Sequence, residues 1–190
     1  MAAHLIRRRV LALVAAGLLA ACVSPIQATS EPATPAAEAV TRLFLVRHGE
    51  KEAGPDPDLS PAGSARAAAL AERLSAEGVT EIWSTNTRRT QQTAAPLAAA
   101  LGLPVQTYDA GALPTLANQL AEAPGVKLVV GHSNTTDALA ALIGADPGPP
   151  IDDATEFDRL YVITISGDHQ VTSRIERYGA SSPQAEKPVP

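Results

Sequence analysis

Short apolar runs alternate along the chain with longer, alanine-rich segments of helical period. The apolar runs are rich in β-forming residues and predict strands over 42–46, 81–85, 103–108 and 127–131. The segments between them predict helices over 61–77, 89–101, 114–123 and 135–143. Two further runs, 160–166 and 171–178, flank the turn sequence GDHQ and predict a hairpin.

Helix boundaries are marked by their usual residues. Ser60 is the expected N-cap of the first helix, Pro61 occupies its first position, and Gly78 ends it. Pro96 is expected to kink the second helix. Regular alternation of strands and helices predicts an α/β fold, namely a three-layer α/β/α domain with a mostly parallel central sheet, over residues 41–178.

The first 21 residues look unlike the rest. Three arginines precede an apolar run that ends in Leu19-Ala20-Ala21-Cys22, a pattern that resembles the bacterial lipoprotein signal. The resemblance implies cleavage before Cys22, acylation of its thiol and anchoring at the periplasmic face of the outer membrane. An ordinary secretory signal, giving a secreted or periplasmic protein, is the alternative. Residues 23–40 predict a flexible Pro/Ala/Thr-rich linker, and residues 179–190 a disordered tail.

Composition narrows the function classes. The chain has 190 residues, 45% hydrophobic, and a formal net charge of -5, which suits one domain with a sizeable core. An acidic protein without a basic stripe is not expected to bind nucleic acid. The single cysteine excludes an internal disulfide framework.

Histidines and arginines follow three of the predicted strands. Arg47 and His48 come directly after the first strand, the pair Arg88-Arg89 comes shortly after the second, and His132 with Ser133 follows 127–131. Ligands of open α/β sheets bind beyond the carboxyl ends of the strands, so these side chains are expected to converge. Arginine forks suit a phosphoryl group, and a neutral histidine can attack phosphorus. Nearby cations and a backbone carbonyl, such as that of Gly49, would keep one ring nitrogen unprotonated.

Three segments together resemble the histidine phosphatase superfamily, the phosphoglycerate-mutase-like proteins: "LVRHGE", "STNTRRTQQTAAPLA" and "VVGHSNT". The resemblance implies a phosphatase acting through a phosphohistidine on His48, with Arg47, Arg89 and His132 holding the phosphoryl oxygens and Ser133 as a further binding residue. It also implies no cofactor and no metal ion, and a phosphorylated small molecule or phosphoprotein as substrate. Arg88 is expected to be a neighbour of the clamp.

The chain departs from that family where a glutamate proton donor is usual. Leu113 occupies that place, and the candidate acids are Asp109, Glu50 and Asp137. This departure resembles the short branch with a reduced acid apparatus.

Two alternatives remain. "GHSNT" is similar to a serine-esterase elbow, in which Ser133 would attack an ester and His169 would be the only downstream histidine. The other alternative is a catalytically weak protein of the cell envelope that binds phosphate or another anion. Asp152, Asp153 and Glu156 are expected to be loop charges or the rim of a pocket.

Overall fold

The computed structural model describes residues 40–182. In chain order its elements are β1 (Thr41–Arg47), α1 (Pro61–Leu74), β2 (Glu81–Ser84), α2 (Arg88–Leu101), β3 (Val105–Thr107), α3 (Leu113–Glu122), β4 (Gly125–Gly131), α4 (Ser133–Ile143), β5 (Arg159–Ile165) and β6 (Val171–Arg177). The predicted signal segment, Cys22 and nearly all of the linker lie outside the described residues, as do residues 183–190. No helix within 40–182 has the length and apolar character needed to cross a membrane.

The sheet is mixed, so the expectation of a mostly parallel sheet was only partly right. Its six strands lie in the order β3-β2-β4-β1-β5-β6. The first four are parallel to one another, whereas β5 is antiparallel to β1 and β6 to β5. After α4 the chain returns through residues 144–158 to the carboxyl end of β1, where Leu160 pairs with Val46. Strand β5 starts at that end and must therefore run back along β1.

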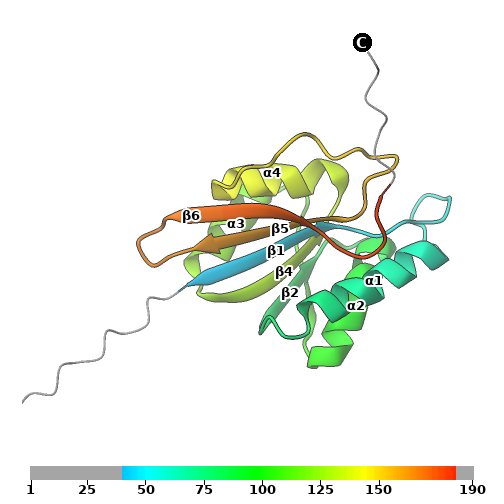
Figure 1. Ribbon diagram of the computed structural model, residues 1–190, viewed down its shortest axis with the longest axis horizontal. Coiled ribbons are helices and arrows are strands. Elements are labelled where there is room, and N and C mark those ends of the chain that lie inside the picture. Colours follow the sequence, from blue (N-terminus) through cyan, green and yellow to red (C-terminus); the bar gives the residue numbers. More distant parts are fainter. Residues whose placement is uncertain (1–39, 183–190) are drawn as a thin grey trace, which may run out of the picture. The chain divides into compact units, whose positions relative to one another are not determined.

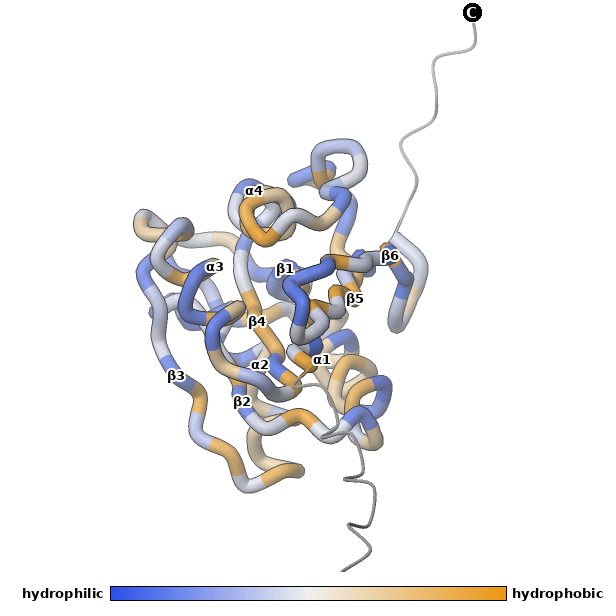
Figure 2. The backbone as a smooth tube through the Cα atoms, turned by 90° about the vertical axis from the view of Figure 1, so that its left-hand side faces the viewer, coloured by the Kyte–Doolittle hydropathy of each residue, from blue (hydrophilic) through white to orange (hydrophobic). Residues whose placement is uncertain are grey.

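Two layers of helices cover the sheet, as the sequence predicted. Alternate residues of β1 point to opposite faces, as the pleat requires. Phe44 and Val46 pack in one cluster with residues of α1 and α2, and Leu43 and Leu45 in another with residues of α3 and α4. Figure 1 shows α1 and α2 on one side of the strands and α4 on the other, and in Figure 2 the hydrophobic β4 lies between the two layers.

Local signals in the sequence set most of the helix ends. The Ser60 hydroxyl accepts a hydrogen bond from the Gly63 amide at 3.2 Å, which caps α1. This helix stops at Leu74, three residues before the predicted end. Helix α4 starts at Ser133, two residues earlier than predicted, which places Ser133 in its first turn.

The folded domain also extends beyond its predicted boundary. Ser182, assigned from the sequence to a disordered tail, is 9% exposed. Its amide donates to the Asp158 carboxylate at 3.0 Å, and its hydroxyl accepts from the Phe157 amide at 2.8 Å. The segment 179–182 therefore packs against the start of β5, and its hydrogen bonds hold the end of the 144–158 loop.

Candidate active site

Two neighbouring strands deliver the two histidines. Strands β1 and β4 are parallel with Arg47 opposite Gly131, and His48 continues this pairing by donating its amide to the Gly131 carbonyl at 3.0 Å. The rings of His48 and His132 lie with centroids 5.4 Å apart and planes at 75°. The predicted meeting of the two imidazoles at the carboxyl end of the sheet is confirmed.

Hydrogen bonds fix the tautomer of His48, which is 2% exposed. A carbonyl can only accept, so the contact of 2.7 Å with the Gly49 oxygen places the proton on Nδ1. Nε2 is then unprotonated, and its lone pair accepts a hydrogen bond from the Arg89 Nε at 3.1 Å. The sequence expectation that the Gly49 carbonyl holds this ring is correct. Nε2 is the nucleophilic atom that the site offers.

Both site histidines are neutral near pH 7. The pKa of His48 is lowered to about 3, chiefly by burial; the charges of Arg47 and Arg89 act in the same direction, and the hydrogen bond with Gly49 opposes them. Burial also lowers the pKa of His132 to about 4, with the same two arginines acting in the same direction. The sequence had named the neighbouring cations as the cause, whereas burial contributes most.

The two adjacent arginines at the start of α2 have different surroundings. Arg89 is 17% exposed and reaches the His48 ring, with its Nη1 3.6 Å from the Asp56 carboxylate. Arg88 is 60% exposed and pairs with Asp58 at 2.6 Å. The structure therefore supports Arg89 as the arginine of the site and Arg88 as its surface neighbour.

Arg47 lies beneath the 144–158 loop and is 3% exposed. Its Nη1 donates to the carbonyls of Asp152 and Glu156 at 3.1 and 3.0 Å, and its Nη2 to the carbonyl and carboxylate of Asp153, both at 2.7 Å. The Phe157 ring lies 4.1 Å from its guanidinium carbon. Only Nε is buried without a hydrogen-bond partner. A buried donor without a partner calls for an explanation, and the charge of Arg47 acts on both histidines, so an anion bound at this site would account for it.

The loop that follows His48 is held from two sides. Its Gly49 amide donates to the Thr93 hydroxyl at 3.0 Å, and that hydroxyl donates to the Arg89 carbonyl at 2.7 Å. Gly49 also lies so close to α1 that a β-carbon there would come within 2.9 Å of the Gly63 oxygen. Thr93 lies one helical turn after Arg89, and its hydroxyl therefore connects the loop of His48 to the start of α2.

Ser133 and Asp153 form a second part of the site. The Ser133 hydroxyl donates to the Asp153 Oδ1 at 2.5 Å, the same oxygen that accepts from Arg47. The sequence had placed Asp153 no closer than the rim. A loop carboxylate next to a second carboxylate carries no local pattern, so no signal in the sequence could have selected it.

The acidic residues that the sequence suggested as proton donors, Glu50, Asp109 and Asp137, each accept hydrogen bonds from other groups. Glu50 is bound by the Nε and Nη2 of Arg66 at 2.6 to 3.1 Å. Burial would raise its pKa, but the Arg66 hydrogen bonds, a backbone hydrogen bond and the charges of Arg66 and Arg47 together lower it. Asp109 accepts from the Gly111 amide at 2.8 Å, and lines a cavity with His132. Asp137 accepts from the Ala138 amide at 2.7 Å. Leu113 packs against the hydrophobic cluster under α3.

The arrangement needed for a serine esterase is not formed. The Ser133 hydroxyl donates to a carboxylate rather than to an imidazole. His169 lies in the β5–β6 turn, and Ile165 at that end of β5 pairs with Thr41, the first residue of β1. Figure 1 shows this turn at the end of the sheet opposite the site. For metals, residues 40–182 contain no group of three or more His, Cys, Asp or Glu side chains placed to hold an ion.

Comparison with known proteins agrees with this geometry. Residues 43–110 match the family model of the histidine phosphatase superfamily, branch 1. Over 78 residues the chain is 40% identical to phosphoserine phosphatase 1 of Hydrogenobacter thermophilus. That alignment spans 37% of this chain and 37% of the relative, so it covers well under half of either protein.

Solved structures share the fold over a longer span. The protein histidine phosphatase SixA, complexed with tungstate, matches with a TM-score of 0.58 at 19% identity, covering 72% of this chain and 96% of that one. The mycobacterial glucosyl-3-phosphoglycerate phosphatase matches with a TM-score of 0.53 at 18% identity, covering 75% and 100%. At such identities the likeness concerns the fold. The sequence match to the histidine phosphatase superfamily therefore concerns residues 43–110, and the similarity beyond them is one of fold.

Proposed function

We propose that the protein is a phosphatase that hydrolyses phosphoric monoesters or phosphohistidine through a covalent intermediate on His48. The observation that carries the proposal is the unprotonated Nε2 of a neutral, buried His48, which accepts a hydrogen bond from Arg89 and lies near His132 and the charge of Arg47. The match of residues 43–110, which include His48 and Arg89, to the histidine phosphatase family model supports it, as does the similarity to a phosphoserine phosphatase.

In the first step the His48 Nε2 attacks phosphorus, and the bond to the leaving oxygen breaks. In the free protein the Arg89 Nε donates to this Nε2. When the substrate binds, that hydrogen bond breaks and the Arg89 Nε donates to a phosphoryl oxygen instead. The Arg47 Nε supplies a second positive donor, and His132 faces the same space. The three phosphoryl oxygens thus meet donors already in place, and such preorganisation is the main source of catalysis in phosphoryl transfer.

In the second step water attacks phospho-His48 and the N–P bond breaks. The electron pair returns to Nε2, and inorganic phosphate leaves. The Gly49 carbonyl keeps the proton on Nδ1 throughout, so the ring recovers the same tautomer at the end of the cycle. The positive charge comes from two guanidinium groups, and we propose that the reaction needs no metal ion or cofactor.

The decisive experiment compares the full-length protein with His48→Ala on p-nitrophenyl phosphate in the presence of EDTA. Because the nucleophile is lost, we expect turnover to fall by at least ~10³-fold. A phosphoenzyme should be trapped from a ³²P-labelled substrate with the acid lability of a phosphoramidate. The same substitution should leave folding, followed by circular dichroism, intact.

Other outcomes separate the alternatives. Equal turnover by the variant and the wild type would exclude His48 as nucleophile. Tight phosphate binding without hydrolysis would favour the anion-binding protein. Hydrolysis of p-nitrophenyl acetate that is lost in Ser133→Ala would favour the esterase.

We further propose a place in the cell envelope, with the chain anchored through lipid on Cys22 at the periplasmic face of the outer membrane. The support is the sequence of residues 1–22 alone. Replacing Cys22 by serine should move the protein from the membrane fraction to the soluble periplasmic fraction. Mass spectrometry of the purified N-terminus should show the lipid directly; an unmodified cysteine would contradict the anchor.

A further inference from the structure

A cavity adjoins the site on the α4 side, where Ser133 and Asp153 form part of its wall. It has a volume of about 630 Å³ and lies between the first two turns of α4 and the loop 147–153. The rest of its lining is largely apolar and includes Ala138, Ala141 and Ile151, while Asp137 adds a second carboxylate. Such a space can take the organic part of a phosphoric monoester whose phosphoryl group lies against His48.

Asp153 stands at the junction between this cavity and the phosphate-binding groups. Its Oδ1 accepts hydrogen bonds from the Arg47 Nη2 at 2.7 Å and from the Ser133 hydroxyl at 2.5 Å. Among the carboxylates of residues 40–182, Asp153 is the one that pairs with Arg47, whose buried Nε has no hydrogen-bond partner. Its side chain is 81% exposed, so it can exchange protons with solvent.

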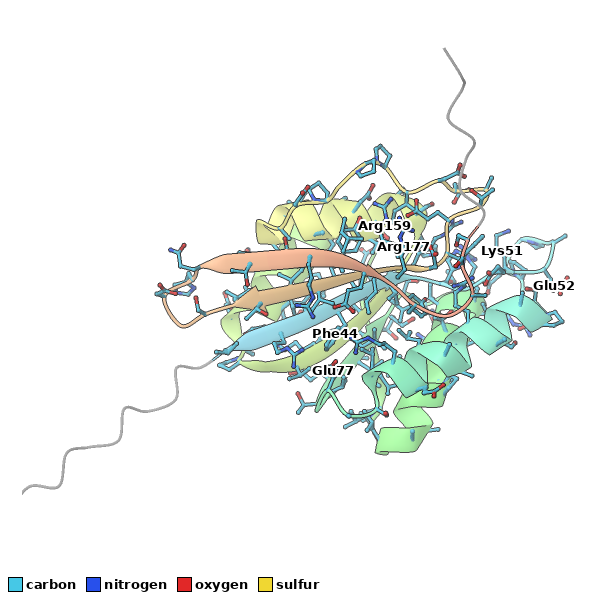
Figure 3. The ribbon with its side chains drawn as sticks, in the orientation of Figure 1. Phe44, Lys51, Glu52, Glu77, Arg159 and Arg177 are labelled. Atoms are coloured by element: carbon cyan, nitrogen blue, oxygen red, sulfur yellow. The ribbon has the colours of Figure 1, made fainter. Side chains whose placement is uncertain are left out.

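The loop that carries Asp153 is held in place by ion pairs beneath it. Glu156 accepts from the Arg159 Nε at 2.7 Å and from the Arg177 Nη1 at 2.6 Å. Arg159 also donates to the Pro149 carbonyl at 2.7 Å. Figure 3 shows Arg159 and Arg177 side by side under this loop. With Arg47 bound to the loop carbonyls as well, the position of Asp153 is fixed by strands β1, β5 and β6.

We propose that Asp153 is the proton donor to the leaving oxygen of a substrate whose organic group occupies this cavity, in place of the glutamate that the chain lacks at Leu113. This inference rests on the proposed phosphatase function and deepens it. It names the substrate class: monoesters of alcohols, which leave slowly unless protonated. The leaving group is neutral or cationic, because the cavity wall carries two carboxylates and no lysine or arginine.

The protons balance over the two steps. The His48 Nε2 forms its bond to phosphorus as the P–O bond breaks, and the proton of Asp153 passes to the departing oxygen to give the free alcohol. The Asp153 carboxylate then takes a proton from the water that attacks phospho-His48. Inorganic phosphate leaves, Nε2 regains its electron pair, and solvent restores the starting state.

Asp153 must gain a proton when the substrate binds. In the free protein the hydrogen bond from Ser133 lowers its pKa, and the charge of Arg47 acts in the same direction. A dianionic phosphoryl group beside the carboxylate repels its charge and competes for Arg47, and both effects raise the pKa. Proton uptake is therefore coupled to substrate binding.

The test uses two substrates that differ in their need for an acid. p-Nitrophenolate leaves readily without being protonated. The ethanolamine oxygen of phosphoethanolamine leaves readily only when an acid protonates it. In Asp153→Asn, which keeps the shape of the side chain, we expect kcat for phosphoethanolamine to fall ~10²-fold or more. The kcat for p-nitrophenyl phosphate should fall less than ~5-fold by the same reasoning. Asp153→Glu should recover part of the loss on phosphoethanolamine.

Asp109→Asn is the matched control, since it removes a carboxylate near the site that does not line this cavity. It should not change the ratio of the two rates. A selective loss in Asp109→Asn, or an equal loss on both substrates in Asp153→Asn, would overturn the proposal. So would faster turnover of both substrates in Asp153→Asn, because the carboxylate would then hinder the reaction rather than assist it. A wild type that hydrolyses only the aryl ester would also overturn it. If neither the wild type nor His48→Ala hydrolyses either substrate, the phosphatase function itself fails.

Discussion

At the scale of single residues, adjacent positions in the chain have unrelated roles. Arg88 and Arg89 start the same helix and differ by one position, yet Arg88 forms an exposed pair with Asp58 and Arg89 donates to the His48 ring. Successive helical residues point about 100° apart, so only one of two neighbours can face the strand ends. The amino-acid type alone does not distinguish them; the direction of the side chain does.

This difference gives a matched pair of variants. Arg89→Ala removes a charged donor to the phosphoryl group, and we expect kcat/KM for p-nitrophenyl phosphate to fall ~10²–10³-fold. Arg88→Ala removes an exposed ion pair, which contributes ~0–1 kcal/mol to stability and nothing to the site. Steady-state kinetics of both variants tests the assignment. Comparable losses in both would mean that Arg88 also reaches the substrate.

At the scale of elements, the site depends on how closely α1 approaches the segment after β1. The Ser60 amide donates to the Glu50 carbonyl at 2.9 Å, and a β-carbon on Gly63 would come within 2.0 Å of that carbonyl oxygen. The lack of a side chain at Gly63 therefore allows the helix to lie against the loop of His48. Arg66, one turn later, fixes the same loop through Glu50.

Gly63→Ala tests this packing against helix propensity. Propensity alone predicts that alanine stabilises α1 by ~1 kcal/mol. The clash with backbone predicts a loss of ~1–3 kcal/mol in the free energy of unfolding, because neither segment can move without breaking its hydrogen bonds. Urea unfolding should show the loss, and kcat should fall as His48 is displaced. Ser64→Ala, at the exposed neighbouring position, should change neither; a more stable Gly63→Ala would show that the loop is free to adjust.

At the scale of the whole molecule, burying two neutral imidazoles links folding to pH. Both histidines have a pKa near 6.5 when unfolded, against about 3 for His48 and about 4 for His132 in the folded protein. Below pH 6.5 the unfolded chain therefore binds more protons than the native one. Stability from these groups is present above that pH and is lost as the pH falls towards 4.

We expect the free energy of unfolding to decrease on acidification from pH 7 to pH 5. Each histidine contributes at most ~1.4 kcal/mol per pH unit over the range in which it is protonated only when unfolded. Urea unfolding at several pH values measures the slope. In the double variant His48→Gln/His132→Gln, the free energy of unfolding should change less steeply with pH. An unchanged slope would show that other titratable groups cause the loss of stability at low pH.

Much of the fold followed from local patterns, but the extent of the parallel sheet did not. Strand positions, the Ser60 cap and the hairpin were predicted because period, capping residues and turn residues act over a few neighbours. The reversal of β5 depends on where the 144–158 loop ends, which is a long-range property. The early start of α4 goes with its cap: His132 is the N-cap, and its amide donates to the Thr135 hydroxyl at 2.9 Å, so the helix already begins at Ser133.

What the sequence determined by itself is the set of groups that meet at the strand ends: Arg47, His48, Arg89 and His132. Each of them comes directly or shortly after a predicted strand. Ligands of parallel sheets bind at the carboxyl ends of the strands, so the sequence predicts that these groups converge. Only the tertiary structure decided which donors stay free, that Glu50 is bound by Arg66, and that Asp153 reaches Arg47 and Ser133. These depend on contacts between residues that lie 16, 20 and 106 positions apart, which no local pattern in the chain encodes.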